Sequence, residues 1–258
     1  MCSKQYVIFV SYYSDYFNRS FEILKNISFS VSKNSKFIIV NNNPLNHIPN
    51  SKSYDVIVSD NRFWEFSAWE DGIKYIEDNY DVSDDDVVIF ANDTFCQHRP
   101  FSFWDSKLFS RKFRALHNHK NAVVGDIDSF GSSFTLQGKS AKEWISTYLF
   151  AMSFKNVRKC LPLSSFIESD IKISNDKIKG VDASNEILEH LERWLFPKDG
   201  GGWYKSNSVG NTIIKKKLIA ILNEKHLSCK ISDNRIDMIG VYSSFIIKLI
   251  RKLRLKFI

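Results

Sequence analysis

The sequence predicts an α/β protein with a mostly parallel, Rossmann-like central sheet flanked by helices, and with a C-terminal helical appendage. The main observation is that short β-branched or aromatic runs alternate with stretches of helical periodicity before residue 100. The second is the composition, because 258 residues with 43% apolar side chains can bury a large core. The chain contains only 10 Gly and 5 Pro, which excludes collagen-like, low-complexity and linker-rich classes.

The first part of the chain supplies strands and helices in alternation. Strands are expected at the apolar runs 6–10, 36–40, 54–58 and 87–90. Helices are expected at 16–27 and 65–80. In the first helix Phe21 and Leu24 recur at helical spacing, and Asp15 is the expected N-cap. This order is typical of parallel neighbours joined by crossover helices.

Polar residues follow each of these strands. They are Ser11 and Tyr12, then 41–43, 59–61 and 92–94. In open α/β sheets ligands bind outside the carboxyl ends of the strands, so these segments are expected to converge on one crevice. Polar loops at strand ends are also what any protein surface requires.

The periodicity after residue 100 is weaker. A strand is expected at 122–125, a strand alone or a strand with a helix at 144–152, and helices at 183–195 and 215–222. Residues 200–202 are three glycines and are expected to form a flexible loop. No internal repeat or linker divides the chain, which favours one compact domain over 1–240 and a separate tail at 241–258.

The charge of the chain is concentrated at its end. Lys and Arg number 36 against 29 Asp and Glu, a net charge of +7. Residues 245–258 contain no acid and five cations, which leaves 31 cations against 29 acids, or +2, for the rest. This pattern indicates a basic tail and no nucleic-acid partner. As a helix the tail would have one apolar and one basic face and would bind an anionic membrane surface, whereas 252–257 alternate like a strand.

The cysteines form no C-x-x-C pair. They stand at positions 2, 96, 160 and 229. They are expected to be free thiols in a reducing compartment, and the apolar run at 6–10 is too short for a signal peptide or a membrane span. A cytoplasmic protein is expected.

Two segments carry a resemblance to a known family. Residues 61–73 (NRFWEFSAWEDGI) precede an acidic turn and the apolar strand that ends in NDT at 92–94. This arrangement resembles family 2-like bacterial glycosyltransferases of the GT-A fold, and most of all the rhamnan-synthesis and O-antigen group. The segment 144–150 resembles a further motif of that group. Arg62 and Phe63 replace an expected glycine, and the Asp-x-Asp motif retains only Asp93.

The resemblance implies a GT-A-like hexosyltransferase that moves a sugar from a nucleotide-sugar donor to a lipid-linked surface polysaccharide, O-antigen or capsule, at the inner face of the cytoplasmic membrane. Residues 1–100 would then bind the donor and 101–240 the acceptor. Two alternatives stay open. One is a noncatalytic membrane- or nucleic-acid-binding protein with a basic tail. The other is a GT-A-like nucleotidyltransferase, although residues 11–14 lack the glycine of a phosphate loop.

The same resemblance places candidate donor-site residues. Asp93 would be catalytic and would hold Mg²⁺ or Mn²⁺, or the donor ribose. The residues expected around the nucleotide are Ser11, Asn61, Trp69, Asp71 and Asn92. The alternative is that 92–94 only cap the following turn.

An inverting transfer also needs a carboxylate base. The candidates are Glu168, Asp170, Glu186 and Glu189. Glu186 is chosen because Ser184 or Asn185 would cap a helix that it opens. The alternative role for Glu186 is a first-turn acid that complements the helix dipole.

Overall fold

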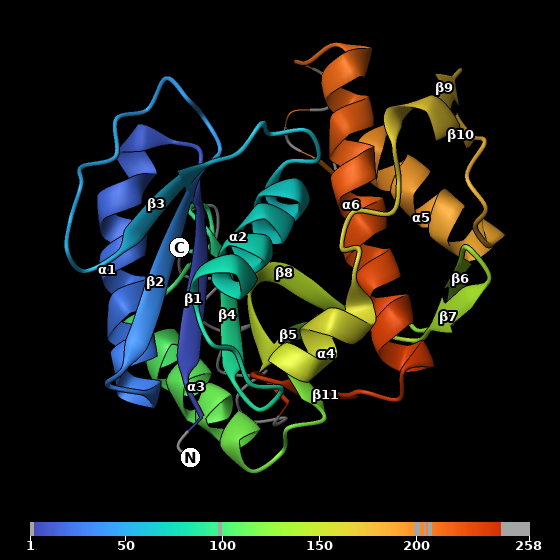
Figure 1. The fold of residues 1–258 in the computed structure, drawn as a ribbon. Helices are drawn as coiled ribbons and strands as arrows, with labels where there is room; N and C mark the ends of the chain where they lie inside the picture. Colours follow the sequence, from blue (N-terminus) through green and yellow to red (C-terminus); the bar gives the residue numbers. More distant parts are fainter. Residues whose placement is uncertain (1–2, 98–99, 199–201, 204, 206–207, 244–258) are drawn as a thin grey trace.

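The computed structural model describes residues 3–97, 100–198, 202, 203, 205 and 208–243. A seven-stranded sheet with the order β11-β5-β8-β4-β1-β2-β3 forms its centre. Helices cover both faces of this sheet (Figure 1). The expected fold class is therefore confirmed as α/β with a mostly parallel, Rossmann-like sheet, consistent with the GT-A type.

The strands are parallel with one exception. They are β1 (Gln5–Ser11), β2 (Ser35–Asn41), β3 (Asp55–Val58), β4 (Val87–Asn92), β5 (Ala122–Asp128), β8 (Trp144–Ser153) and β11 (Asp237–Gly240). Within this sheet, β8 runs antiparallel to both its neighbours, β4 and β5. The central strands are continuous apolar runs because helices bury them on both faces, as in β1, where every residue is buried.

Two helices cover one face and three cover the other. α1 (Ser14–Val31) and α3 (Phe103–Arg114) share one apolar cluster with the sheet. α2 (Glu65–Asn79), α4 (Phe154–Cys160) and α6 (Asn211–Asp233) share the opposite cluster. These elements bury the two faces of the sheet separately.

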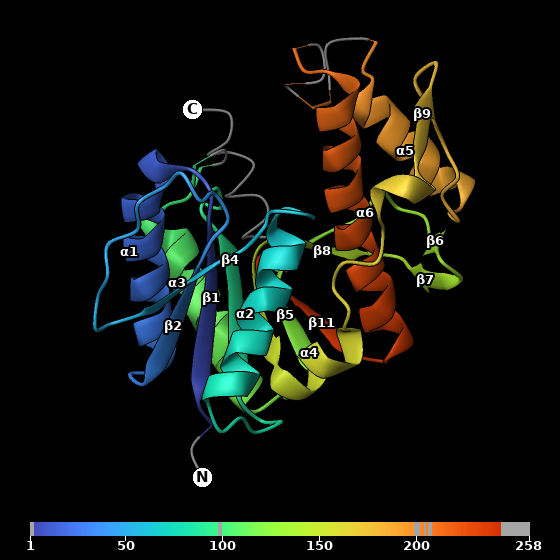
Figure 2. The same cartoon turned by 45° about the horizontal axis from the view of Figure 1, so that its top comes forward.

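A third cluster lies beyond α6. It contains α5 (Asn185–Leu195), the hairpin β6–β7 (Phe134–Leu136 and Lys139–Ala141) and the hairpin β9–β10 (Lys172–Ser174 and Lys177–Lys179). Short 3-10 turns, Ala115–His117 and Glu168–Asp170, join neighbouring elements. In both views α6 lies between α5 and the sheet (Figure 2).

The structure differs from the sequence predictions at the start of α1 and near the predicted tail. Tyr13 occupies the N-cap position of α1, so Asp15 lies in the first turn and the N-cap prediction was wrong. The sheet gains β11 just before the predicted tail, and Val241 and Tyr242 are buried against the fold. The amphipathic tail beyond residue 243 and the glycines at 200 and 201 lie outside the described residues.

The sequence analysis missed α3. Its start is marked by a capping box, in which Ser102 binds the backbone of the third helical residue and Asp105 binds the Ser102 backbone. The Ser-x-x-Asp spacing was a usable signal. No helix in the described part of the chain is long and apolar enough to cross a membrane.

Gly72 allows α2 to approach β1 closely. A Cβ atom at this position would lie 2.6 Å from Cγ2 of Ile8, a branched side chain fixed in the central strand. We expect Gly72→Ala to lower the free energy of unfolding by about 1–3 kcal/mol through overpacking. Urea denaturation measures this, and Gly240→Ala is the control, because its added Cβ makes only ordinary van der Waals contacts, at 3.6 Å or more. Equal, small effects at both positions would contradict this account of the packing.

His226 on α6 is buried and uncharged. It is 3% exposed, packs edge to face on Phe166, and has no hydrogen-bond partner for either ring nitrogen in the described structure. Burial, and then the charges of Lys230 and Lys139, lower its pKa to about 4. As the pH falls, this histidine is protonated in the unfolded chain at a higher pH than in the folded chain. The free energy of unfolding therefore decreases over that range.

We expect wild-type protein to lose about 3 kcal/mol more unfolding free energy than His226→Leu between roughly pH 6.5 and pH 4. Denaturation curves of both proteins across this range measure the difference. Because the other titrating groups are common to both, their contributions cancel. Parallel stability profiles would show that His226 titrates normally in the folded protein.

Candidate functional site

Hydrogen bonds join the carboxyl ends of the first four parallel strands. The Asn42 N–H donates to the Ser11 carbonyl at 2.8 Å, and the Ser59 N–H donates to the Asn41 carbonyl at 3.0 Å. The Asp93 N–H donates to the Val10 carbonyl at 2.9 Å. The predicted convergence of the polar strand ends is confirmed, and we call this region the strand-end site.

Asp93 holds the turn between β1 and α1. Its Oδ2 accepts hydrogen bonds from the backbone N–H groups of Tyr12 and Tyr13, both at 2.6 Å. The side chain is buried at 2% exposure, and the Asp93 carbonyl accepts a bond from the Ser20 hydroxyl at 2.6 Å. Burial raises the pKa of Asp93 to about 6 against the opposing effect of the two N–H groups. Glu65 adds a further upward contribution.

The neighbours of Asp93 also bond locally. Asn92 Oδ1 accepts a bond from the Thr94 hydroxyl at 2.8 Å, and the Phe95 N–H donates to the Asn92 carbonyl at 3.2 Å. Each of the three residues at 92–94 thus helps to shape the following turn. This is the alternative role that the sequence left open for them.

The donor set at Asp93 does not form a metal site by itself. The carboxylate is buried and already accepts two N–H bonds, and Asn92 and Thr94 supply only neutral oxygens that bond each other. Among the described residues, no group of three His, Cys, Asp or Glu side chains is arranged to hold a metal ion. Mg²⁺ or Mn²⁺ would need most of its ligands from a substrate.

Two buried polar atoms at the strand-end site have no partner. They are Oγ of Ser11 and Oδ1 of Asn42, and within the described part of the chain neither makes a hydrogen bond. Ser11 is 1% exposed and Asn42 is 2% exposed. Orphaned polar atoms are costly in a protein interior, so their presence at converging strand ends indicates a place for a polar ligand or water.

The loop between β3 and α2 closes one side of this site. Asn61 and Trp64 both adopt left-handed backbone angles, with φ of 55° and 54°. Asn42 Nδ2 holds the loop by donating to Asn61 Oδ1 at 2.8 Å and to the Trp64 carbonyl at 3.1 Å. Left-handed angles are strained for a tryptophan, and such strain persists only where neighbours fix it.

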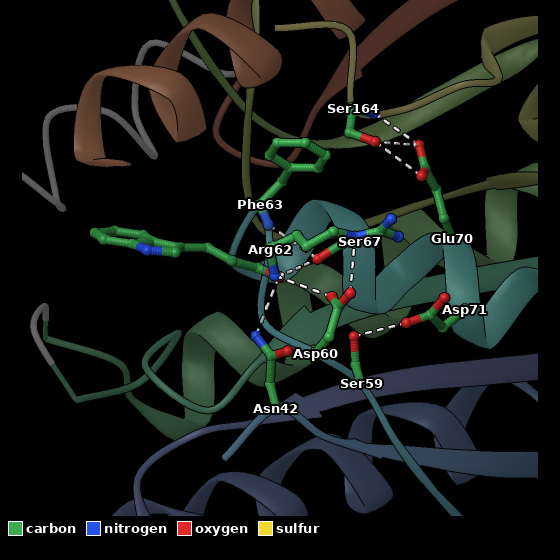
Figure 3. Close-up of polar contacts among 10 residues, drawn as sticks. Asn42, Ser59, Asp60, Arg62, Phe63, Ser67, Glu70, Asp71 and Ser164 are labelled. Carbon is green, nitrogen blue, oxygen red and sulfur yellow. Dashed lines mark hydrogen bonds and ion pairs between the residues drawn. The ribbon is translucent and has the colours of Figure 1, made fainter. Parts of the chain in front are cut away.

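Asp71 faces the same loop from α2. Its Oδ2 accepts a bond from the Ser59 hydroxyl at 2.6 Å (Figure 3). An open groove of about 440 Å³ lies here, lined by both residues and by Asp60, Arg62 and Lys74 among others. The structure therefore brings together Ser11, Asn61, Asp71, Asn92 and Asp93 around the strand ends.

Trp69 lies elsewhere. It is 0% exposed and packs edge to face on Phe90 and Phe150, with ring centroids 5.8 and 5.4 Å away. This tryptophan is part of the core beneath α2, so its contacts with the rest of the site are indirect. It fixes the helix that carries Asp71 and Glu65.

Glu186 is likewise distant from the strand ends. It lies exposed in the first turn of α5. This helix is on the far side of α6 from the sheet (Figures 1 and 2). Hydrogen bonds from its own backbone and from Ser184 lower its pKa. These are the properties of an acid that complements a helix dipole. Its role as a base stays a prediction.

The sequence analysis did not select Glu65, which begins α2. Burial raises the pKa of its carboxyl, the nearby Lys217 opposes that shift, and Glu224 adds to it. Glu65 also contributes to the raised pKa of Asp93. It stands inside the 61–73 segment that carried the family resemblance, which was the available signal.

Glu224 and Lys225 face the start of β8. Glu224 accepts bonds from the Thr147 N–H and hydroxyl, both at 2.9 Å, and from Lys225 Nζ at 2.9 Å. Burial acts to raise its pKa, but Lys225 and Thr147 leave it below the usual range. Lys225 Nζ lies 3.5 Å from the centre of the Trp144 ring. No sequence motif marked this pair.

Two aromatic rings lie beside Lys217 of α6. Lys217 Nζ lies 5.4 Å from the Trp64 ring and 5.7 Å from the Trp194 ring. Trp194 in turn stacks on Trp203 at 6.3 Å. Such rings over a cation or a sugar face are common in sites that bind polar ligands.

Comparisons with known proteins give distant likenesses in structure alone. No family profile and no curated sequence matches the chain. Among solved structures, a 4-diphosphocytidyl-2C-methyl-D-erythritol synthase matches with 8% identity and a TM-score of 0.43. The match covers 64% of this chain and 81% of that one. The class that the structure itself defines is an α/β protein with a mostly parallel, Rossmann-like sheet and a polar strand-end site.

Asp93 contributes to stability through the two N–H groups that it accepts. We expect Asp93→Ala to lower the free energy of unfolding by about 1–3 kcal/mol, because the backbone N–H groups of Tyr12 and Tyr13 lose the buried carboxylate that accepts their hydrogen bonds. Asp93→Asn retains an acceptor oxygen and is expected to recover most of this. Chemical denaturation at neutral pH measures both variants, with the exposed Asp78→Ala as control. An alanine variant as stable as wild type would show that the turn does not depend on Asp93.

Proposed function

We propose that this chain is a glycosyltransferase that uses a nucleotide-sugar donor. The observation that carries the proposal is the strand-end site, where the polar ends of four strands are hydrogen-bonded together and buried oxygens of Ser11 and Asn42 lack partners. Ligands bind at this edge in open α/β sheets. The resemblance at 61–73 and 87–94 supports glycosyl transfer among the reactions that such a fold performs.

The donor nucleotide would occupy the side of the site near α2. Ser11, Asn61, Asp71 and Asn92 offer hydroxyl, amide and carboxylate groups to the base and ribose. The groove beside Ser59 and Asp71 has the polar lining that a nucleoside requires. Trp69 would act only by positioning α2. Asp93 would shape the backbone of the β1–α1 turn, whose N–H groups it binds.

The leaving diphosphate requires positive charge. Lys217 lies on α6 within electrostatic range of Glu65 and beside the Trp64 ring, so it is the side chain that we propose for this role. Mg²⁺ or Mn²⁺ held at Asp93 is the alternative from the sequence. When bound with the donor, such an ion would supply charge neutralisation of the same kind.

Glu65 is the carboxylate that we propose as the base. It would accept the proton of the acceptor hydroxyl while that oxygen attacks the anomeric carbon and the bond to the diphosphate oxygen breaks. Its pKa is raised by burial, as suits a base that must hold a proton and release it. Glu186, exposed on α5, is the competing assignment from the sequence.

The acceptor that we propose is a lipid-linked oligosaccharide of a surface polysaccharide, reached from the cytoplasmic face of the membrane. The support is the family resemblance and the basic segment 241–258. The enzyme would associate peripherally with that face through its tail.

The donor is tested by thermal denaturation with UDP, GDP, dTDP and CMP sugars, and with the nucleoside triphosphates as a second set. A donor at about 100 times its Kd should stabilise the fold by about 2.7 kcal/mol and raise Tm. Sugar nucleotides are expected to stabilise and triphosphates alone are not. Stabilisation by a triphosphate with pyrophosphate release would instead identify a nucleotidyltransferase. No response to either set would exclude the donor site, and repetition in EDTA tests the metal.

Glu65→Gln should reduce transfer about 10²–10⁴-fold with donor binding unchanged, because the variant cannot accept a proton. Single-turnover transfer to a soluble acceptor glycan and donor titration give the two readouts. Glu186→Gln is the matched control and is expected to act like wild type. If the effects are reversed, Glu186 is the base.

A further inference from the structure

The outward side of α3 combines aromatic and basic residues. Phe103 and Trp104 at its start are 68% and 58% exposed. Lys107, Arg111 and Arg114 are also exposed, and with Phe103 they repeat at helical spacing along the same side. We call these five residues the outer face of α3. It has an apolar end and a basic end.

Acidic side chains on α3 do not offset the positive charge of this face. α3 contains four cations and one acid, Asp105, which is 8% exposed. Asp105 turns inward, where it binds the Ser102 N–H and the Tyr242 hydroxyl. On the other face of the sheet, α2 carries five acids and one lysine. α3 is therefore a basic helix, and α2 on the opposite face of the sheet is an acidic one.

The aromatic end is held in a form suited to a bilayer interface. Lys107 Nζ lies 4.5 Å from the Phe103 ring and 5.6 Å from the Trp104 ring. Trp and Phe side chains enter the headgroup region of a membrane, while a lysine beside them keeps its ammonium at the phosphates. The basic residues farther along α3 continue this pattern with charge alone.

Other exposed apolar groups lie at the same edge of the molecule. α3 follows β4 and begins at the carboxyl edge of the sheet, where the loops after β1 and β2 also lie. Tyr12 in the first loop is 38% exposed and Leu45 in the second is 93% exposed. The edge that carries the strand-end site thus also carries exposed large apolar side chains.

The C-terminal basic segment also starts beside α3. Tyr242 packs on Phe109 with ring centroids 6.0 Å apart, and Lys112 Nζ donates to the Ser243 hydroxyl at 3.4 Å. The next fifteen residues of the sequence, 244–258, contain five cations and no acid. The described chain therefore ends next to a surface of the same sign.

We propose that the outer face of α3 is a docking surface for the headgroups of an anionic lipid bilayer. It places the face of the sheet that α1 and α3 cover toward the membrane, with the carboxyl edge beside the aromatic start of α3. The inference rests on the proposed function only in that a lipid-linked acceptor explains the orientation, because lipid binding needs no turnover. The adjacent, highly exposed Phe103 and Trp104 favour a bilayer over a nucleic acid, whose binding depends chiefly on cations.

The test is co-sedimentation of the full chain with vesicles of phosphatidylglycerol and phosphatidylcholine in equal parts, and with pure phosphatidylcholine. Two variants are compared with wild type: Phe103→Ser with Trp104→Ser, and Lys107, Arg111 and Arg114 each →Gln. Each is expected to weaken partitioning to the anionic vesicles by about tenfold or more. The first variant removes aromatic side chains that enter the headgroup region, and the second removes cations that strengthen binding to an anionic surface. A blue shift of tryptophan emission on vesicle binding should be reduced by the first variant.

Matched controls are Ile167→Ser, an exposed apolar residue elsewhere, and Lys142, Lys172 and Lys179 each →Gln, three exposed lysines outside α3. They should partition like wild type, and all variants should keep the wild-type Tm. Equal partitioning by the α3 variants and wild type would overturn the proposal and assign any binding to the tail. Absence of wild-type binding, or stronger α3-dependent binding to duplex DNA than to vesicles, would overturn it too. Donor binding is measured separately, so failure here leaves the proposed reaction standing.

Discussion

The architecture depends on β8, the strand that joins the two parts of the sheet. Its backbone pairs with β4 on one side and β5 on the other, and nearly all of its residues are buried. The stacked rings of Phe90 and Phe150, 4.7 Å apart, pack across one of these pairings. Because β8 is antiparallel, it begins at the edge where its parallel neighbours end. Thr147 is thereby placed near the strand ends, and it positions Glu224 of α6.

Polar groups at this edge fall into two kinds. Asp93 and Asn42 form hydrogen bonds with the backbone of neighbouring loops, and these bonds hold the loops in place. Ser11 Oγ and the side-chain oxygen of Asn42, Oδ1, are left without hydrogen-bond partners in the described structure. A buried donor or acceptor without a partner costs stability, whereas a ligand that supplies the bond recovers it. By this criterion Asp93 builds the site, whereas Ser11 Oγ and Asn42 Oδ1 are the atoms at which a polar ligand or water would relieve an unmet hydrogen bond.

The helices α2 and α3, which cover opposite faces of the sheet, differ in net charge. Asp71 and Asp78 of α2 line the groove that we assign to a nucleotide, and Lys74 and Arg62 are the cations among its lining residues. The basic residues lie on α3, across the sheet. A polarity of this kind would hold the protein in one orientation at an anionic surface, with the strand-end site at the shared edge.

The sequence by itself determined the alternating strands and helices before residue 100, because two-sided burial makes each central strand an apolar run such as Tyr6–Val10. It also determined that polar residues meet at one edge, since parallel strands end together. It did not place Trp69, which shares a segment with Asp71 but points into the core, as 0% exposure shows. Nor did it point to Glu224, or select Lys217 from the three consecutive lysines at 215–217. Only the tertiary structure brought α6 against α2 and the start of β8, because contacts between residues so far apart in the chain are set by packing and not by local pattern.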